Sequence, residues 1–406
     1  MLETPPLALY VHFPWCVRKC PYCDFNSHAA KAAVPEQRYV ALLLRDLAQE
    51  LPRVEGRALR SIFLGGGTPS LFSPYAMQVL LEGIRGLLPL EVDAEVTLEA
   101  NPGTIERGRF ADYRAAGVTR VSLGAQSFNA RHLRELGRIH SADETRRAVA
   151  ELAHAGIDNF NLDLMYGLPR QTIAEARADL AEALDLGPAH VSHYQLTLEP
   201  GTAFFHAPPP LPPDDETWQM QVECQELLAG RDYAQYEVSA YARAGRESRH
   251  NLNYWDFGDY LGIGAGAHGK VTLKDSAIIV RTTRLRGPKE YMAAVERGTA
   301  PEEAAIAPEQ RPFEFMLNAL RLKSGFSRRG YESRTGLPLS GLDPTFDWAR
   351  GRGLVRPAAG EGWQCTDLGY RFLNDLLARF LAESPSPVGN AYAQAQTMES
   401  AAERCD

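Results

Sequence analysis

The segment LALYVHFPWCVRKCPYCDF (7–25) joins a predicted β-strand to a loop that holds three of the chain's six cysteines. The first seven residues are rich in β-forming side chains and predict a strand. Cys16, Cys20 and Cys23 then follow with the spacing C-x3-C-x2-C. The remaining thiols, Cys224, Cys365 and Cys405, are scattered along the chain. Such crowding indicates metal ligands or redox groups rather than structural thiols.

Composition places these thiols in an ordinary globular protein. The chain has 406 residues, of which 45% are hydrophobic and 23% charged, enough for a large core and a smaller second domain. The net charge of -8 argues against a partner that is nucleic acid or an anionic membrane. We find no apolar run of membrane-spanning length and no secretory signal, so we expect a cytoplasmic protein whose thiols stay reduced.

Beyond the first strand, apolar strands alternate with amphipathic helical stretches. Each strand is followed by a turn signal and then by a helix, which predicts a parallel sheet. About six such units predict an α/β fold of the partial TIM-type (β/α) barrel class, with a doubly wound sheet as the alternative. The predicted strands lie at 7–13, 60–67, 94–102, 119–128, 159–169 and 190–200.

Four regions are predicted along the chain. Residues 1–205 form the β/α core, and residues 206–300 contain a proline-rich linker (206–215) and a segment that completes the barrel. Residues 301–382 form a mostly helical, winged-helix-like domain, in which 353–381 is a hairpin followed by a helix. The polar, aperiodic residues 383–406 are expected to be a disordered tail.

Thiolates are soft ligands that select zinc or iron–sulfur clusters. A structural zinc site needs four ligands, so His12 or His28 would have to join the three cysteines. A [4Fe-4S] cubane held by three cysteines instead leaves one iron open to a chelating small molecule. Unrelated thiols are a third reading of the pattern.

The cysteine loop resembles the signature of the radical S-adenosylmethionine (SAM) superfamily, C-x3-C-x-aromatic-C, with Tyr22 in the aromatic position. The resemblance implies a β/α barrel and a [4Fe-4S] cluster whose open iron chelates SAM. In GGGTPS (65–70), at the end of the second strand, Gly66, Gly67 and Thr68 match the superfamily's glycine motif that contacts the methionine amino group. Alone, that motif would be a plain glycine turn.

Polar residues at later strand ends resemble the ligand set of the anaerobic coproporphyrinogen III oxidase family. Each alone could be a helix cap or a surface charge. Together they match the family's SAM-binding positions, which implies that carboxylates bond the ribose and ammonium groups and that the arginine pairs with a carboxylate. The matched residues are Tyr10, Glu99, Gln126, Arg138 and Asp163.

Two departures from the oxidase point to its heme-chaperone relatives, the HemW subgroup. Phe25 stands where the oxidase has a fourth cysteine, and HNLNYW (250–255) matches the subgroup's HNxxYW motif. The resemblance implies heme binding, for which His250, Asn251, Tyr254 and Trp255 are candidates. For an isolated His-Asn pair, hydrogen bonding within a loop would be the ordinary reading. His268 and His193 are weaker candidates for the iron ligand.

The subgroup resemblance also implies partners. These are heme, respiratory proteins that accept heme, and an electron donor if SAM is cleaved; a respiratory recipient would allow peripheral contact with a membrane. Two other hypotheses remain open: an oxygen-independent coproporphyrinogen III oxidase, and a zinc-stapled binding protein without redox chemistry.

Overall fold

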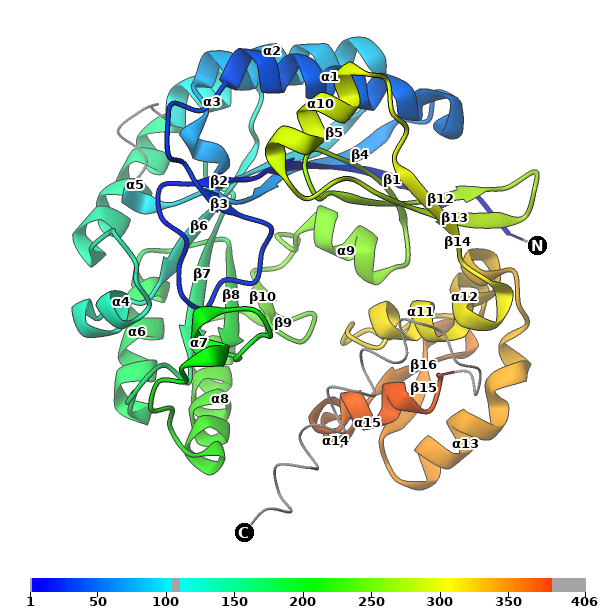
Figure 1. Ribbon diagram of the computed structural model, residues 1–406. Coiled ribbons are helices and arrows are strands. Elements are labelled where there is room, and N and C mark those ends of the chain that lie inside the picture. Colours follow the sequence, from blue (N-terminus) through cyan, green and yellow to red (C-terminus); the bar gives the residue numbers. More distant parts are fainter. Residues whose placement is uncertain (1, 104–109, 382–406) are drawn as a thin grey trace. The chain divides into compact units, whose positions relative to one another are not determined.

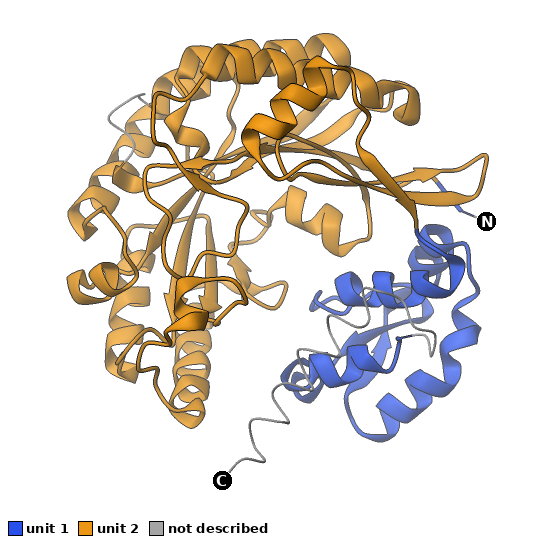
Figure 2. Cartoon of the chain, in the orientation of Figure 1, with its two compact units in different colours: residues 1–3, 306–406 blue, residues 4–305 orange. Residues whose placement is uncertain are grey.

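The computed structural model describes residues 2–103 and 110–381, which fall into two compact units (Figure 2). The larger unit comprises residues 4–305, and the smaller comprises residues 306–381 with the N-terminal residues up to 3. The segment 383–406, predicted to be a disordered tail, lies outside the described residues.

The larger unit is built on a mixed sheet (Figure 1). Within the described residues its strands, in spatial order, are β14 (Glu302–Ala305), β13 (Ile278–Thr283), β12 (His268–Leu273), β11 (Asp259–Ile263), β1 (Leu7–Phe13), β4 (Leu59–Gly66), β5 (Leu90–Ala100), β6 (Arg120–Gln126), β7 (Phe160–Tyr166), β8 (His190–Gln195), β10 (Ala240–Ala242) and β9 (Ala234–Gln235).

The predicted β/α alternation is confirmed. β1 and β4 to β8 are parallel neighbours in chain order, so the sheet lacks the strand-order reversal of a doubly wound fold. Across the described residues the sheet stays open, with β14 and β9 at its edges. One parallel strand was not predicted: β11 pairs with β1, with Leu7 opposite Asp259, although its sequence was read only as a glycine-rich segment.

Helices cover the outer face of the curved sheet (Figure 1). They are α1 (Glu36–Val54), α2 (Pro74–Leu87), α3 (Phe110–Ala116), α5 (Ala142–Ala155), α6 (Ile173–Asp185) and α8 (Asp214–Ala229), with α10 (Pro288–Glu296) beside α1. Shorter elements are β2 (Trp15–Cys16), β3 (His28–Ala29), η1 (Pro69–Leu71), α4 (Ala130–Glu135), α7 (Ala203–His206) and α9 (Arg249–Trp255).

Local sequence explains where these helices begin and what they bury. Ser141 starts α5 and Thr172 starts α6 with capping boxes, each completed by a glutamate three residues later. In α1, Leu43 and Leu47 are fully buried against the sheet core. The apolar face of each helix is thus matched to the nearly continuous hydrophobic strands beneath it.

A buried ionic cluster ties the returning strands to α1. The Asp46 carboxylate accepts hydrogen bonds from the Arg284 guanidinium at 3.1 Å and the Tyr291 hydroxyl at 2.8 Å. It also accepts from the backbone amide of Gly264 at 3.2 Å. Because Gly264 lies in the turn between β11 and β12, this cluster fixes that turn against the first β/α unit.

The smaller unit is mostly helical, as predicted, and carries one hairpin. Its elements are η3 (Pro308–Gln310), α11 (Arg311–Ala319), α12 (Arg328–Thr335), η4 (Leu339–Leu342), α13 (Asp343–Gly351), β15 (Val355–Ala358), η5 (Ala359–Glu361), β16 (Gly362–Cys365), α14 (Asp367–Arg371) and α15 (Leu373–Ala378). Phe346 stacks on Trp363 at 4.9 Å in its core. The prediction of a single helix after the hairpin is wrong, because the helical conformation is interrupted at Phe372 and two short helices form instead.

Candidate functional site

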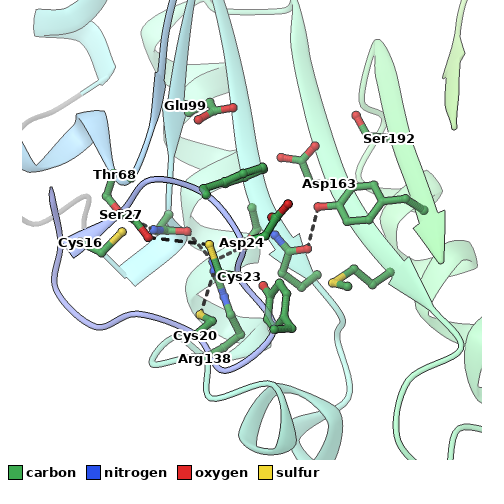
Figure 3. A pocket seen from close by; sticks show the side chains of 18 of the residues that line it. Cys16, Cys20, Cys23, Asp24, Ser27, Thr68, Glu99, Arg138, Asp163 and Ser192 are labelled. Carbon is green, nitrogen blue, oxygen red and sulfur yellow. Dashed lines mark hydrogen bonds between the residues drawn. The ribbon is translucent and has the colours of Figure 1, made fainter. Parts of the chain in front are cut away.

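A cavity of about 440 Å³ lies at the carboxyl ends of the parallel strands, where ligand sites of β/α folds occur (Figure 3). Three groups of residues predicted from the sequence meet in it: the cysteine loop, the glycine loop and the polar strand ends. It is lined by Cys16, Cys20, Cys23, Tyr22, Gly66, Gly67, Thr68, Glu99, Gln126, Arg138 and Asp163. Tyr10 instead lines a neighbouring cavity.

The three loop cysteines are free thiols and half-buried. The Arg138 guanidinium donates to Cys20 Sγ at 3.8 Å, and Cys23 Sγ lies 3.8 Å from the Ser27 hydroxyl (Figure 3). Burial raises the pKa of the Cys16 and Cys23 thiols. A metal that binds here must therefore displace protons, so its binding strengthens as pH rises.

This donor set fits a cubane better than zinc. Among the described residues, no three His, Cys, Asp or Glu side chains converge on one point, as a single ion requires. Thiols that hold a cubane bind different irons and stay apart. His12, a suggested fourth zinc ligand, uses Nδ1 with the Tyr10 hydroxyl at 2.9 Å and Nε2 with the Asn26 carbonyl at 2.8 Å.

Backbone hydrogen bonds hold the glycine loop against the cysteine loop. The amide of Gly67 donates to the Phe13 carbonyl at 2.7 Å, and that of Thr68 donates to the Trp15 carbonyl at 2.8 Å. A Cβ on residue 67 would lie 2.6 Å from the Trp15 oxygen, so this contact requires glycine.

Gly66 is required for a different reason. Its φ of +111° is disfavoured for other residues, and an added Cβ would lie 2.4 Å from the His12 ring. Its amide donates to Glu99 at 3.0 Å. The amides of Gly66, Gly67 and Thr68 all donate within the protein, so none of the three is left to bind an anionic group.

Two carboxylates face the cavity from neighbouring parts of the sheet. Enclosure raises the pKa of Glu99 to about 8, and repulsion from Asp163 adds to this shift. Asp163 accepts hydrogen bonds from Ser122 at 3.1 Å and Asn161 at 2.8 Å, and burial raises its pKa. A cationic ligand beside them would lower the pKa of both carboxyl groups.

Arg138 is the basic group opposite them. Its Nη2 donates to the Gly124 carbonyl at 2.7 Å and to Asn101 Oδ1. Its Nε is buried and has no hydrogen-bond partner within the described part of the chain. A buried donor without a partner is costly, and a ligand carboxylate would satisfy it.

Sequence reasoning missed several residues around these groups. Asn101 bonds both Arg138 and the Thr68 hydroxyl, and the Tyr194 hydroxyl donates to Gln126 Oε1 at 3.0 Å. Gln126 itself has a φ of +65°, which turns the chain at the end of β6. Asn101 lies next to the end of the predicted strand 94–102, so the strand-end criterion that selected Glu99 would also have found it. Tyr194 lies in the middle of the predicted strand 190–200, so that criterion would have missed it.

The HNLNYW segment forms α9, which is capped by Ser248. His250 is 1% exposed and stacks on Phe63 at 4.9 Å. Its Nδ1 lies 3.0 Å from the Ser61 hydroxyl and its Nε2 3.2 Å from the Tyr254 hydroxyl, so both ring nitrogens are engaged. Asn251, Tyr254 and Trp255 are half-buried on the same helix.

A second cavity of about 620 Å³ adjoins the first and shares Asp24, Phe25, Gly66 and Glu99 with it. Its lining includes Tyr10, Tyr254, Tyr260, His268 and Arg286. His193, the other weak heme candidate, is buried and stacks on Tyr166 at 4.7 Å. Burial lowers the pKa of His193 to about 4.

Comparisons with known proteins agree with this arrangement. Family models match the radical SAM superfamily over residues 10–183 and the HemN C-terminal domain over 306–372. The solved structure of Escherichia coli coproporphyrinogen III oxidase (HemN), described as a radical SAM enzyme, has a TM-score of 0.78, with 22% identity over 93% of this chain and 90% of that one. At that identity the likeness shows the shared fold.

Two curated relatives, each named heme chaperone HemW, align over their whole length. The Escherichia coli protein is 49% identical over 94% of this chain, and the Haemophilus influenzae protein is 48% identical over 94%. A mouse mitochondrial protein named radical S-adenosyl methionine domain-containing protein 1 is 40% identical over 71% of this chain and 66% of its own.

The fold, the cysteine loop and the family matches define a radical SAM protein, a class that implies a [4Fe-4S] cluster and SAM as cofactors. Within that superfamily, the chain belongs to the HemW family. No helix in the described ranges is long and apolar enough to cross a membrane.

Replacing Glu99 with glutamine should reveal its raised pKa. The folded protein holds this proton up to about pH 8, whereas an unfolded glutamate loses it near pH ~4.3. Its stability contribution is therefore complete below the unfolded pKa and is lost as pH rises toward 8. Urea titrations without SAM should show the wild type losing roughly 3–4 kcal/mol relative to Glu99→Gln between pH 5 and 8.

Glu91→Gln, an exposed position on the same strand, is the matched control and should show no such pH dependence. A constant difference between wild type and Glu99→Gln across this range would contradict the assigned pKa.

The cysteines can be tested by metal analysis. Cys20→Ala should lose most of the iron and acid-labile sulfide after anaerobic reconstitution, because a cubane with two thiolates is poorly held. Cys224→Ala removes a buried thiol outside the loop and should keep about four irons per chain. Full iron content in Cys20→Ala, or a colourless zinc-loaded wild type, would refute the assignment.

Proposed function

We propose that this chain is a heme-binding chaperone that delivers heme to respiratory proteins and is built on a radical SAM scaffold. The observation that carries the proposal is its 49% identity, over the whole relative, to a protein named heme chaperone HemW. The HNLNYW motif and Phe25 in place of a fourth cysteine support it. We place the protein in the cytoplasm, with heme-accepting respiratory proteins as partners at or near the membrane.

The cofactor roles follow from the chemistry of the first cavity. We propose that Cys16, Cys20 and Cys23 hold the cluster, which when bound supplies the open iron and the electron of radical SAM chemistry. The buried Nε of Arg138 would pair with the SAM carboxylate. Glu99 and the glycine-loop carbonyls would bond its ammonium group.

The remaining SAM residues surround the rest of the ligand. Asp163, held by Ser122 and Asn161, would accept from the ribose hydroxyls. Tyr22 and Gln126 would pack beside them, with Gln126 fixed by Tyr194. Tyr10 lines the second cavity, and its neighbour Glu99 lines both cavities. Tyr10 would therefore contact the cofactor from the wall that the two cavities share. If SAM is cleaved, an electron donor is needed as a further partner.

For heme we propose that the HNLNYW motif acts through Tyr254. His250 accepts or donates at both ring nitrogens, and one partner is the Tyr254 hydroxyl. His250 thus orients an aromatic ring that lines the second cavity, where it can cover a porphyrin face. Asn251 and Trp255, which lie on the same helix as Tyr254, would shape the heme pocket.

Heme titration and an oxidase assay on one sample test the proposal. Anaerobically reconstituted protein should bind heme at low micromolar concentration, read from its Soret absorbance. The same sample with reductant, SAM and coproporphyrinogen III should form no protoporphyrinogen. Absence of heme binding at that concentration would overturn the chaperone proposal, and formation of protoporphyrinogen would replace it with the oxidase alternative.

The motif's role can be tested separately. His250→Ala should weaken heme binding by about tenfold while the cluster content stays unchanged, because Tyr254 loses its anchor. Tyr254→Phe keeps the ring but removes the hydroxyl that His250 anchors, so it should weaken heme binding to a similar extent. Because His250 is buried, the Soret maximum of residual complex should stay in place; a shifted maximum that millimolar imidazole restores would make His250 an iron ligand instead.

A further inference from the structure

We propose that heme binds in the second cavity, with His268 Nε2 as an axial ligand of the iron and Arg286 pairing with a propionate. This inference rests on the proposed heme-chaperone function and assigns its site. The cavity's volume of about 620 Å³ falls within the range of roughly 300–1,000 Å³ that ligand sites occupy.

His268 has the geometry of an iron ligand. It begins β12 opposite Thr283, and its Nδ1 lies 3.3 Å from the Thr283 hydroxyl. No hydrogen bond to Nε2 occurs among the described residues, and the side chain is exposed. When Nδ1–H donates to Thr283, the Nε2 lone pair is free to bind iron.

The surroundings keep this imidazole neutral. Burial of part of the ring and the positive charges of Arg281, Arg286 and Arg284 lower the pKa of His268. The other candidates lack an open nitrogen or an open position. His250 is engaged at both nitrogens, and His193 is buried against Tyr166.

Aromatic side chains supply the porphyrin contacts. Tyr254 packs edge-on against Tyr260 at 4.5 Å, and the Tyr260 hydroxyl accepts from Arg281 at 3.2 Å. Phe25 is 59% exposed, an unusual position for a phenylalanine beside a cavity. A porphyrin edge would cover this ring, which the fold otherwise leaves in water.

Arg286 completes the site with a charge. It is exposed, and no ion pair involves it in the described ranges. Its backbone carbonyl accepts from Asn26 Nδ2 at 2.9 Å, and the same nitrogen donates to the Ala265 carbonyl at 2.8 Å. These bonds fix Arg286 beside the cysteine loop, where its guanidinium can pair with a carboxylate.

Heme titrations of four proteins test the assignment: wild type, His268→Ala, Arg286→Gln and His154→Ala. His154 is an exposed histidine on α5 and is the matched control. We expect His268→Ala to lose at least tenfold in affinity and to shift its Soret maximum, with millimolar imidazole restoring the spectrum. His154→Ala should match wild type, and all four proteins should carry the same iron–sulfur content.

Arg286→Gln tests the propionate contact. Wild type should prefer heme to its dimethyl ester, and Arg286→Gln should lose that preference. If wild type binds heme but His268→Ala does so with the same affinity and Soret maximum, this site is wrong and the chaperone function stands. If wild type binds no heme, the proposed function fails with it.

Discussion

Two backbone hydrogen bonds, from Gly67 to Phe13 and from Thr68 to Trp15, hold the site together. They join the ends of β1 and β4, which are parallel neighbours and so finish at the same edge of the sheet. The cysteine loop that leaves β1 is thereby pressed against the glycine loop that leaves β4. No residue larger than glycine fits at position 67, so the contact between the two loops requires the glycine of the GGGTPS sequence.

The cavity built on this contact is electrostatically unsatisfied. Burial raises the pKa of both Glu99 and Asp163, and repulsion from Asp163 adds to the shift of Glu99. Arg138 keeps a buried donor without a partner in the described structure. Such an arrangement costs stability in the empty protein. A ligand with a carboxylate and two positive charges would pair with the Arg138 donor and stabilise the ionised carboxylates. SAM carries these charges, which is the reason to expect it in this cavity.

Signals that are local in sequence were the predictable ones. The six β/α strands, the cysteine loop and the strand-end acids follow from apolar runs and from residues beside them, and the structure gathers those residues in one cavity. Contacts between segments far apart in the sequence could not be predicted. β11 pairs with β1, and the His250 ring lies within hydrogen-bonding distance of Ser61, although each pair is widely separated along the chain. The motif therefore predicted a heme contact but could not show that both ring nitrogens are engaged. The residues' roles toward SAM and heme stay predictions.

We propose that the cluster and heme occupy adjoining cavities that share Asp24, Phe25, Gly66 and Glu99. Anomalous diffraction at the iron edge, from crystals of reconstituted protein loaded with heme, tests it most directly. The account predicts one multi-iron peak among Cys16, Cys20 and Cys23 and one separate single-iron peak within bonding distance of His268 Nε2. A single-iron peak in any other part of the molecule would contradict it.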